Sequence, residues 1–122
     1  MMEIKEFPCS QEGVIAAQAF LELRCDEPKP AIILDEIVSN IVRCSGASGF
    51  SIGIDRLPDG LTMVFADDGK AFDPTTEVAT PDITAAAADR DIGGLGIFMV
   101  KKMSKSVSYR REDGKNVLTV RM

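Results

Sequence analysis

Three pairs of apolar residues, spaced four positions apart, run through residues 31–44 (AIILDEIVSNIVRC): Ile33/Leu34, Ile37/Val38 and Ile41/Val42. On a helix that turns about 100° per residue, these six side chains cover an arc of about 180°. An apolar face this wide must be buried against another layer of structure. The segment therefore predicts a core helix, and the rest of the chain must supply the surface on which it packs.

Alternating apolar residues elsewhere predict a sheet that can supply this surface. Residues 50–67 alternate on both sides of the turn PDG and are expected to form a hairpin. Residues 106–122 are expected to form a second hairpin around the turn EDGKN. Residues 2–8 are expected to form a short first strand that ends at Pro8.

Two further helices are expected, one over residues 10–25 with Ser10 as its N-cap, and one from the glycines at 93–96 to about Lys105. Residues 68–92 look irregular, apart from a weak helical pattern in ITAAAAD. The order β-α-α-β-β-loop-α-β-β indicates an α+β two-layer sandwich. We expect a mainly antiparallel mixed sheet of about five strands with about three helices on one face, in a single domain over residues 1–122.

Composition excludes several classes of function. The chain has 122 residues and no histidine, so it cannot itself carry a Ser–His–Asp triad, a Cys–His nucleophile pair, a histidine metal ligand or a phosphohistidine. A net charge of −5 without a long basic run argues against nucleic-acid binding. No stretch is long and apolar enough to span a membrane, and no signal peptide is apparent. Three cysteines without CxxC spacing favour a reduced, cytoplasmic protein.

Three local motifs are candidates for chemistry. Glu36 and Asn40 lie at about 300° and 340° on the helical wheel, at the margin of the apolar arc and one turn apart. Asp67 and Gly69 follow a predicted strand, and glycines at 93, 94 and 96 precede an apolar run. Each motif alone is common without a ligand, as a surface pair, a turn or a flexible helix start. Bare backbone N–H groups at a helix start also suit an anion.

The order and spacing of the three motifs together resemble the GHKL (Bergerat) ATP-binding superfamily, the histidine-kinase-like ATPase domain. Within it, the chain is most similar to the small anti-sigma-factor serine/threonine protein kinases of bacterial partner-switching systems. LDEIVSNIV resembles the family's N-box, DDGKAFDP its first glycine box, GGLGIFMVKKM its second, and GKNVLTV its last strand. The resemblance extends over almost the whole chain.

The resemblance implies specific ligand contacts for ATP and Mg²⁺. Asn40 would give an amide oxygen to the metal, and Asp67 would accept a hydrogen bond from the adenine amino group, with Gly69 allowing the backbone to approach the base. Thr119 would support Asp67 through a shared water. The remaining nucleotide-binding residues implied by the two glycine boxes are Ala71, Phe72, Gly93, Gly94, Leu95, Gly96 and Ile97. Residues 74–92 would form a lid over ATP.

The resemblance also implies an activity. Glu36 would be the catalytic residue, orienting and deprotonating the hydroxyl that attacks the γ-phosphate. The substrate would be a STAS-domain anti-sigma-factor antagonist, a sigma factor would be a second partner, and the chain would form a homodimer. Ala71 departs from the family pattern, because many relatives have a second glycine there. Cys44 and the segment 104–106 also depart from it.

Two alternative functions remain open at this point. One is an ATP- or ADP-binding switch that binds a partner without phosphorylating it. The other is the detached ATP-binding domain of a sensor histidine kinase, with the phosphoacceptor histidine in another chain.

Overall fold

The computed structural model describes residues 2–73 and 92–122, with the backbone alone for Cys44 and residues 92–97. The elements, in chain order, are β1 (Glu3–Pro8), α1 (Gln11–Glu22), α2 (Pro28–Cys44), β2 (Gly49–Leu57), β3 (Gly60–Asp67), α4 (Ile92–Met103), β4 (Ser106–Glu112) and β5 (Lys115–Arg121). The lid expected at 74–92 and the helical pattern in ITAAAAD fall outside the described residues, except for the lid's last residue, which begins α4.

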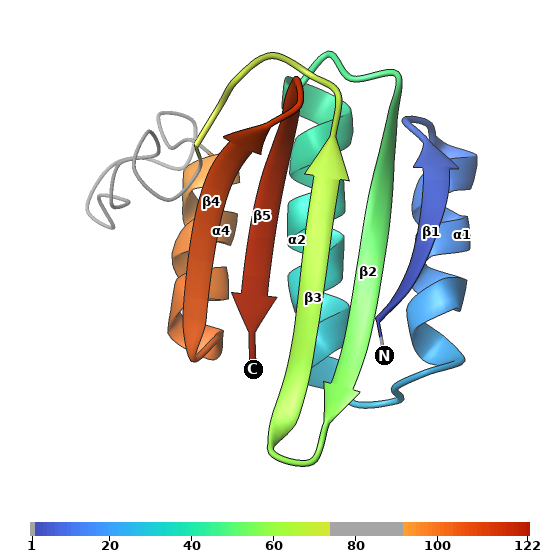
Figure 1. Ribbon diagram of the computed structural model, residues 1–122, viewed down its shortest axis with the longest axis vertical. Helices are drawn as coiled ribbons and strands as arrows, with labels where there is room; N and C mark the ends of the chain where they lie inside the picture. The colour runs from blue at the N-terminus through green and yellow to red at the C-terminus, as the bar shows by residue number, and fades with distance from the viewer. Residues whose placement is uncertain (1, 74–91) are drawn as a thin grey trace.

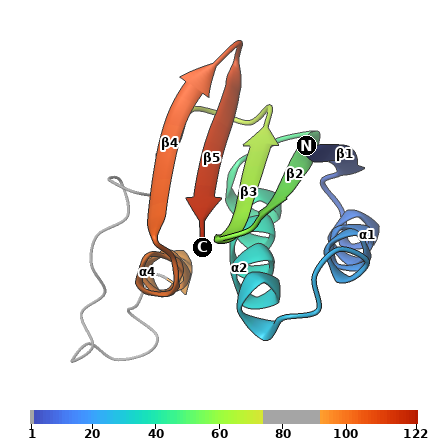
Figure 2. The ribbon, with the colours of Figure 1, turned by 60° about the horizontal axis from the view of Figure 1, so that its bottom comes forward.

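The molecule has two layers, as expected (Figures 1 and 2). The five strands form one sheet in the order β1-β2-β3-β5-β4. All neighbouring strands described by the structure pair antiparallel, so the mixed sheet that we expected is an entirely antiparallel one there. Figure 2 shows α1, α2 and α4 together on one face of this sheet. The predicted α+β sandwich is confirmed.

The helix predicted at 31–44 is the centre of the core. Five of its six paired apolar residues are buried: Ile33, Leu34, Ile37, Val38 and Ile41. They pack in the same cluster as inward-facing strand residues such as Ile52 and Phe65. The helix begins earlier than expected, at Pro28. Proline is compatible with this position because the N–H group that it lacks would have no partner within the first turn of a helix.

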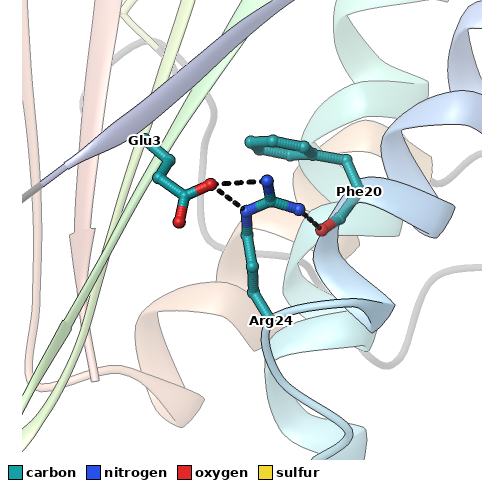
Figure 3. A network of polar contacts seen from close by, with 3 residues as sticks. All are labelled: Glu3, Phe20 and Arg24. Carbon is teal, nitrogen blue, oxygen red and sulfur yellow. Dashed lines mark hydrogen bonds and ion pairs between the residues drawn. The ribbon is translucent and has the colours of Figure 1, made fainter.

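Arg24, which lies just after α1, links this helix to the edge strand β1 (Figure 3). The Arg24 guanidinium lies 3.9 Å from the centre of the Phe20 ring, and its Nε donates to the Glu3 carboxylate on β1 at 2.8 Å. Its Nη1 donates to the Phe20 carbonyl oxygen at 2.8 Å. One side chain therefore joins the C-terminal end of α1 to the beginning of β1.

The predicted helix cap is also present. The Ser10 side chain accepts a hydrogen bond from the Gly13 N–H at 3.2 Å, which satisfies one of the free donors at the start of α1. The described helices include none that is both long and apolar enough to cross a membrane. Cys9 and Cys25 are free thiols.

Replacement of Gly13 by alanine tests how closely α1 packs on β1. Inside a helix this change normally stabilises a protein by about 0.5–1 kcal/mol. Here a Cβ at position 13 would lie 1.8 Å from the Pro8 carbonyl oxygen. We therefore expect Gly13→Ala to lower the free energy of unfolding, by about 1–3 kcal/mol, as measured by urea denaturation.

The matched control for this prediction is Gln11→Ala, an exposed change in the same helical turn that should alter stability by less than about 0.5 kcal/mol. A Gly13→Ala variant as stable as the unchanged protein, or more stable, would contradict the described packing of α1 against Pro8.

Candidate nucleotide-binding site

A cavity opens between α2 and the sheet, at the end of the molecule where β3 finishes and β5 begins. It encloses about 450 Å³ of empty space, including the part open to solvent. Its walls are largely apolar and come from Ile37, Ile41, Phe65, Phe72 and Leu118. Asn40, Ser45, Asp67, Tyr109 and Asn116 add polar groups to this lining.

Asp67 reaches the cavity because of the alternation along β3. Leu61, Met63 and Phe65 face the helices, and Asp67 continues that series as the last residue of the strand. Its side chain is only 7% exposed. Oδ1 accepts hydrogen bonds from the Gly69 N–H at 2.9 Å and from Asn116 Nδ2 at 3.0 Å. Both hydrogen bonds between this carboxylate and the described residues end on Oδ1.

Gly69 is required for a reason that the sequence did not indicate. That it lets the backbone approach a bound base stays a prediction, because Gly69 is not among the residues that line the cavity. A Cβ at this position would lie 2.4 Å from the Ser45 carbonyl oxygen. The neighbouring Lys70 N–H donates to that same oxygen at 3.1 Å. Gly69 therefore allows the segment after β3 to cross directly over the end of α2.

Asp68 connects the segment after β3 to the start of β2. Its carboxylate accepts hydrogen bonds from the Ser48 hydroxyl at 2.6 Å and from the Ser48 and Gly49 N–H groups. These bonds, the Ser48 hydroxyl first, lower the pKa of the Asp68 carboxyl below its usual range. Because the folded pKa is depressed, this stabilisation is present above the unfolded pKa and is lost as the pH falls through the folded value.

Asn40 and Glu36 lie as expected on one edge of α2. Both are half-buried, between the buried face and the exposed Asp35. Asn40 lines the cavity together with Asp67, so the structure brings these two predicted residues to one site. Glu36 is one turn earlier on the same helix and is not among the residues that line the cavity.

The support of Asp67 comes from Asn116 and not from Thr119. Asn116 is the β5 residue directly opposite Asp67 in the register, and both side chains face the helices. Thr119 lies three residues further along and pairs with Val64, so the alternation of the strand directs it to the other face of the sheet. The role that the resemblance implied for Thr119 therefore does not fit this register. The register between β3 and β5, two strands distant in the sequence, was the missing information.

The first glycine box contributes Asp67 and Phe72 to the cavity. Phe72 is half-buried and lines it, whereas Ala71 is exposed and does not. In the second box, the glycines at 93, 94 and 96 lie in the first turns of α4, which begins at Ile92. The side chains of residues 92–97 are outside the described part, so the contacts expected of Leu95 and Ile97 stay predictions.

The start of α4 lies near the same end of the sheet as the cavity. Ser106, which follows α4 closely, pairs with Arg121 at the opposite end of the sheet from Asp67. Figure 1 shows α4 running alongside the sheet from that far end back toward the end where β3 finishes. The three predicted motifs are therefore gathered at one end of the molecule.

Comparison with known proteins agrees with this arrangement. Residues 12–122 match the model of the histidine kinase-like ATPase domain family. The chain is 30% identical over 90 residues to "Serine/threonine-protein kinase BtrW" from Bordetella bronchiseptica, covering 70% of this chain and 63% of that protein's length. Among solved structures it is similar to "Acinetobacter baumannii histidine kinase AdeS", with a TM-score of 0.60 and 13% identity, over 100% of this chain and 68% of that one.

The likeness to AdeS concerns the fold alone, since the identity is low. The family match extends over most of the chain and includes all the elements that form the cavity. A cavity with an acceptor-only carboxylate among apolar walls is consistent with the ATP binding that this family implies. The chain belongs to the histidine kinase-like ATPase family, whose domains are of the GHKL type.

Proposed function

We propose that this chain is an ATP-dependent protein serine/threonine kinase and anti-sigma regulatory factor. It phosphorylates a STAS-domain anti-sigma-factor antagonist, acts as a homodimer and controls the availability of a sigma factor. The observation that carries the proposal is the cavity shared by Asp67 and Asn40 within an ATP-binding fold. The likeness to a protein named as a serine/threonine kinase supports the choice of acceptor.

The cavity suits the base of ATP. Ile37, Ile41 and Leu118 provide flat apolar contact for a purine ring. The buried Asp67 carboxylate is an acceptor only, so it selects a base that presents a donor there. The 6-amino group of adenine is such a donor, whereas the 6-oxo group of guanine is a second acceptor.

Asn40 is placed to serve the phosphates of the same nucleotide. Its carboxamide lies on the α2 edge of the cavity, and its oxygen is a ligand of the type that Mg²⁺ prefers. Mg²⁺ bound to phosphates takes only one or two protein ligands and keeps water for the rest. When bound, the metal neutralises charge on the phosphates. The N–H groups in the first turn of α4 are the matching partners for phosphate oxygens.

Glu36 is the proposed catalytic residue. It lies one helical turn before Asn40 and is half-buried, so its carboxylate is near the metal end of the nucleotide and still reachable by a second protein. A carboxylate in hydrogen-bond reach of a serine or threonine hydroxyl orients it and accepts its proton during transfer.

A second candidate function is a nucleotide-gated switch that binds its partner without phosphorylating it. The position of Glu36 outside the lining of the cavity favours this alternative. The two functions differ in one observable product, because only the kinase leaves a phosphate on the partner.

The base contact predicts that Asp67→Asn shifts the purine preference from ATP toward inosine triphosphate. In that variant the Gly69 N–H and Asn116 Nδ2 hold the new amide oxygen at the Oδ1 position, so the amide NH₂ faces the cavity. A donor there opposes the adenine amino group and suits the 6-oxo group of inosine triphosphate. We expect the affinity for ATP to fall at least about 10-fold relative to that for inosine triphosphate.

Calorimetric titration with the Mg²⁺ complexes of both nucleotides measures this ratio. The matched control is Asp68→Asn, which changes the adjacent carboxylate but leaves the cavity lining intact. It should lower the stability of the free protein and keep the preference for ATP. An Asp67→Asn variant with an unaltered ATP preference would remove Asp67 from base recognition.

The catalytic proposal predicts a specific loss in Glu36→Gln. Phosphate transfer from radiolabelled ATP to STAS-domain proteins of the same organism should fall at least about 100-fold, because the proton acceptor is removed. Nucleotide binding, read as the rise in melting temperature with ATP and Mg²⁺, should stay unchanged.

Asp35→Asn is the control for this variant, since Asp35 is a neighbouring exposed carboxylate on the same helix. Undiminished transfer by Glu36→Gln would refute its catalytic role. A protein that binds a STAS partner in the presence of ATP but leaves no phosphate on it would instead be the switch.

A further inference from the structure

We propose that Asn116 is the positioning residue that orients the Asp67 carboxylate and so sets the purine selectivity of the cavity. The inference rests on the proposed nucleotide site. It assigns a role to a residue of the last strand for which the sequence analysis gave none, and it starts from the five hydrogen bonds that this one side chain makes.

The carboxamide oxygen of Asn116 is surrounded by donors. It accepts hydrogen bonds from the Tyr109 hydroxyl at 2.6 Å, from the Phe72 N–H at 3.2 Å and from Arg111 Nη1 at 3.2 Å. With three donors on that side, the oxygen and nitrogen of the amide cannot exchange places. The amide nitrogen is therefore held on the opposite side, toward Asp67.

The amide nitrogen uses both of its hydrogens. It donates to Asp67 Oδ1 at 3.0 Å and to the Lys70 carbonyl oxygen at 2.8 Å. Asn116 is only 6% exposed, so water cannot readily replace these bonds. Because Oδ1 also receives the Gly69 N–H, two donors hold this oxygen, and in the proposed site Oδ2 is the oxygen that a ligand meets.

The same contacts also have a structural effect, which the test must separate. Asn116 and Arg111 together bind backbone groups of Gly69, Lys70 and Phe72, so they anchor the segment after β3 to the β4–β5 hairpin. A loosened segment would weaken every nucleotide equally. A misdirected carboxylate weakens only a nucleotide that donates to Asp67. The ratio of two affinities therefore distinguishes positioning from anchoring.

The test compares ATP with purine riboside triphosphate, which lacks the 6-amino group but keeps the ring, ribose and phosphates. Calorimetric titration of the full chain with Mg²⁺ gives both dissociation constants. The unchanged protein should prefer ATP at least about 10-fold, as expected for a hydrogen bond to a charged acceptor. In Asn116→Ala we expect this preference to fall at least about threefold, mainly through weaker binding of ATP.

Thr119→Val is the matched control, because Thr119 lies on the same strand and faces the other side of the sheet. It should keep the full ATP preference. If Asn116→Ala does not fold, Asn116→Ser replaces it, since a serine hydroxyl is too short to reach both Asp67 and the Lys70 carbonyl.

The outcomes distinguish the positioning role of Asn116 from the proposed nucleotide site itself. A reduced ATP preference in the Asn116 variant, with Thr119→Val unchanged, supports the positioning role. Equal weakening of both nucleotides, or an unaltered preference, overturns it while leaving the nucleotide site intact. An unchanged protein that binds neither nucleotide refutes the proposed site itself, and the inference is refuted with it.

Discussion

The burial of the apolar face of α2 against the sheet is the constraint on which the rest of the structure depends. The buried side chains of Ile33, Leu34 and Val38 fix the rotation of the helix. That rotation leaves the half-buried Asn40 at the margin of the apolar face, where it lines the cavity. Ile37 and Ile41 belong both to the core and to the wall of the cavity. The packing that stabilises the fold therefore also shapes the site.

The second constraint is the cost of a buried carboxylate. An ionised group without partners in an apolar cavity would be strongly unfavourable, so Asp67 needs hydrogen bonds that compensate for lost water. Asn116 and the Gly69 N–H provide them, and the approach of Gly69 to Ser45 makes that geometry possible. The end of β3, the end of α2 and the β4–β5 hairpin therefore meet around Asp67. In the proposed site, a ligand that donates to Oδ2 would complete the set of hydrogen bonds to the carboxylate.

Much of this could be predicted from local patterns, because those patterns report local geometry. The apolar pairs of α2 and the PDG turn gave elements close to those observed, and Asn40 and Asp67 share a cavity as the resemblance implied. What could not be predicted depends on strand register and on backbone contacts between distant segments. The resemblance implied that Thr119 on β5 supports Asp67, whereas the β5 residue opposite Asp67 is Asn116. The clash that makes Gly69 necessary involves Ser45, which no sequence motif connects to it.

The central claim is that an adenine nucleotide occupies the cavity between α2 and the sheet, with its base against Asp67. A crystal structure with a non-hydrolysable ATP analogue and Mg²⁺ tests it most directly. The account predicts the adenine amino nitrogen about 3 Å from Asp67 Oδ2, and the metal bound to the Asn40 carboxamide oxygen. A base bound elsewhere would contradict the account, and so would a base in the second groove that Asp67 lines, together with Ser48, Ala66 and Lys115, away from Asn40.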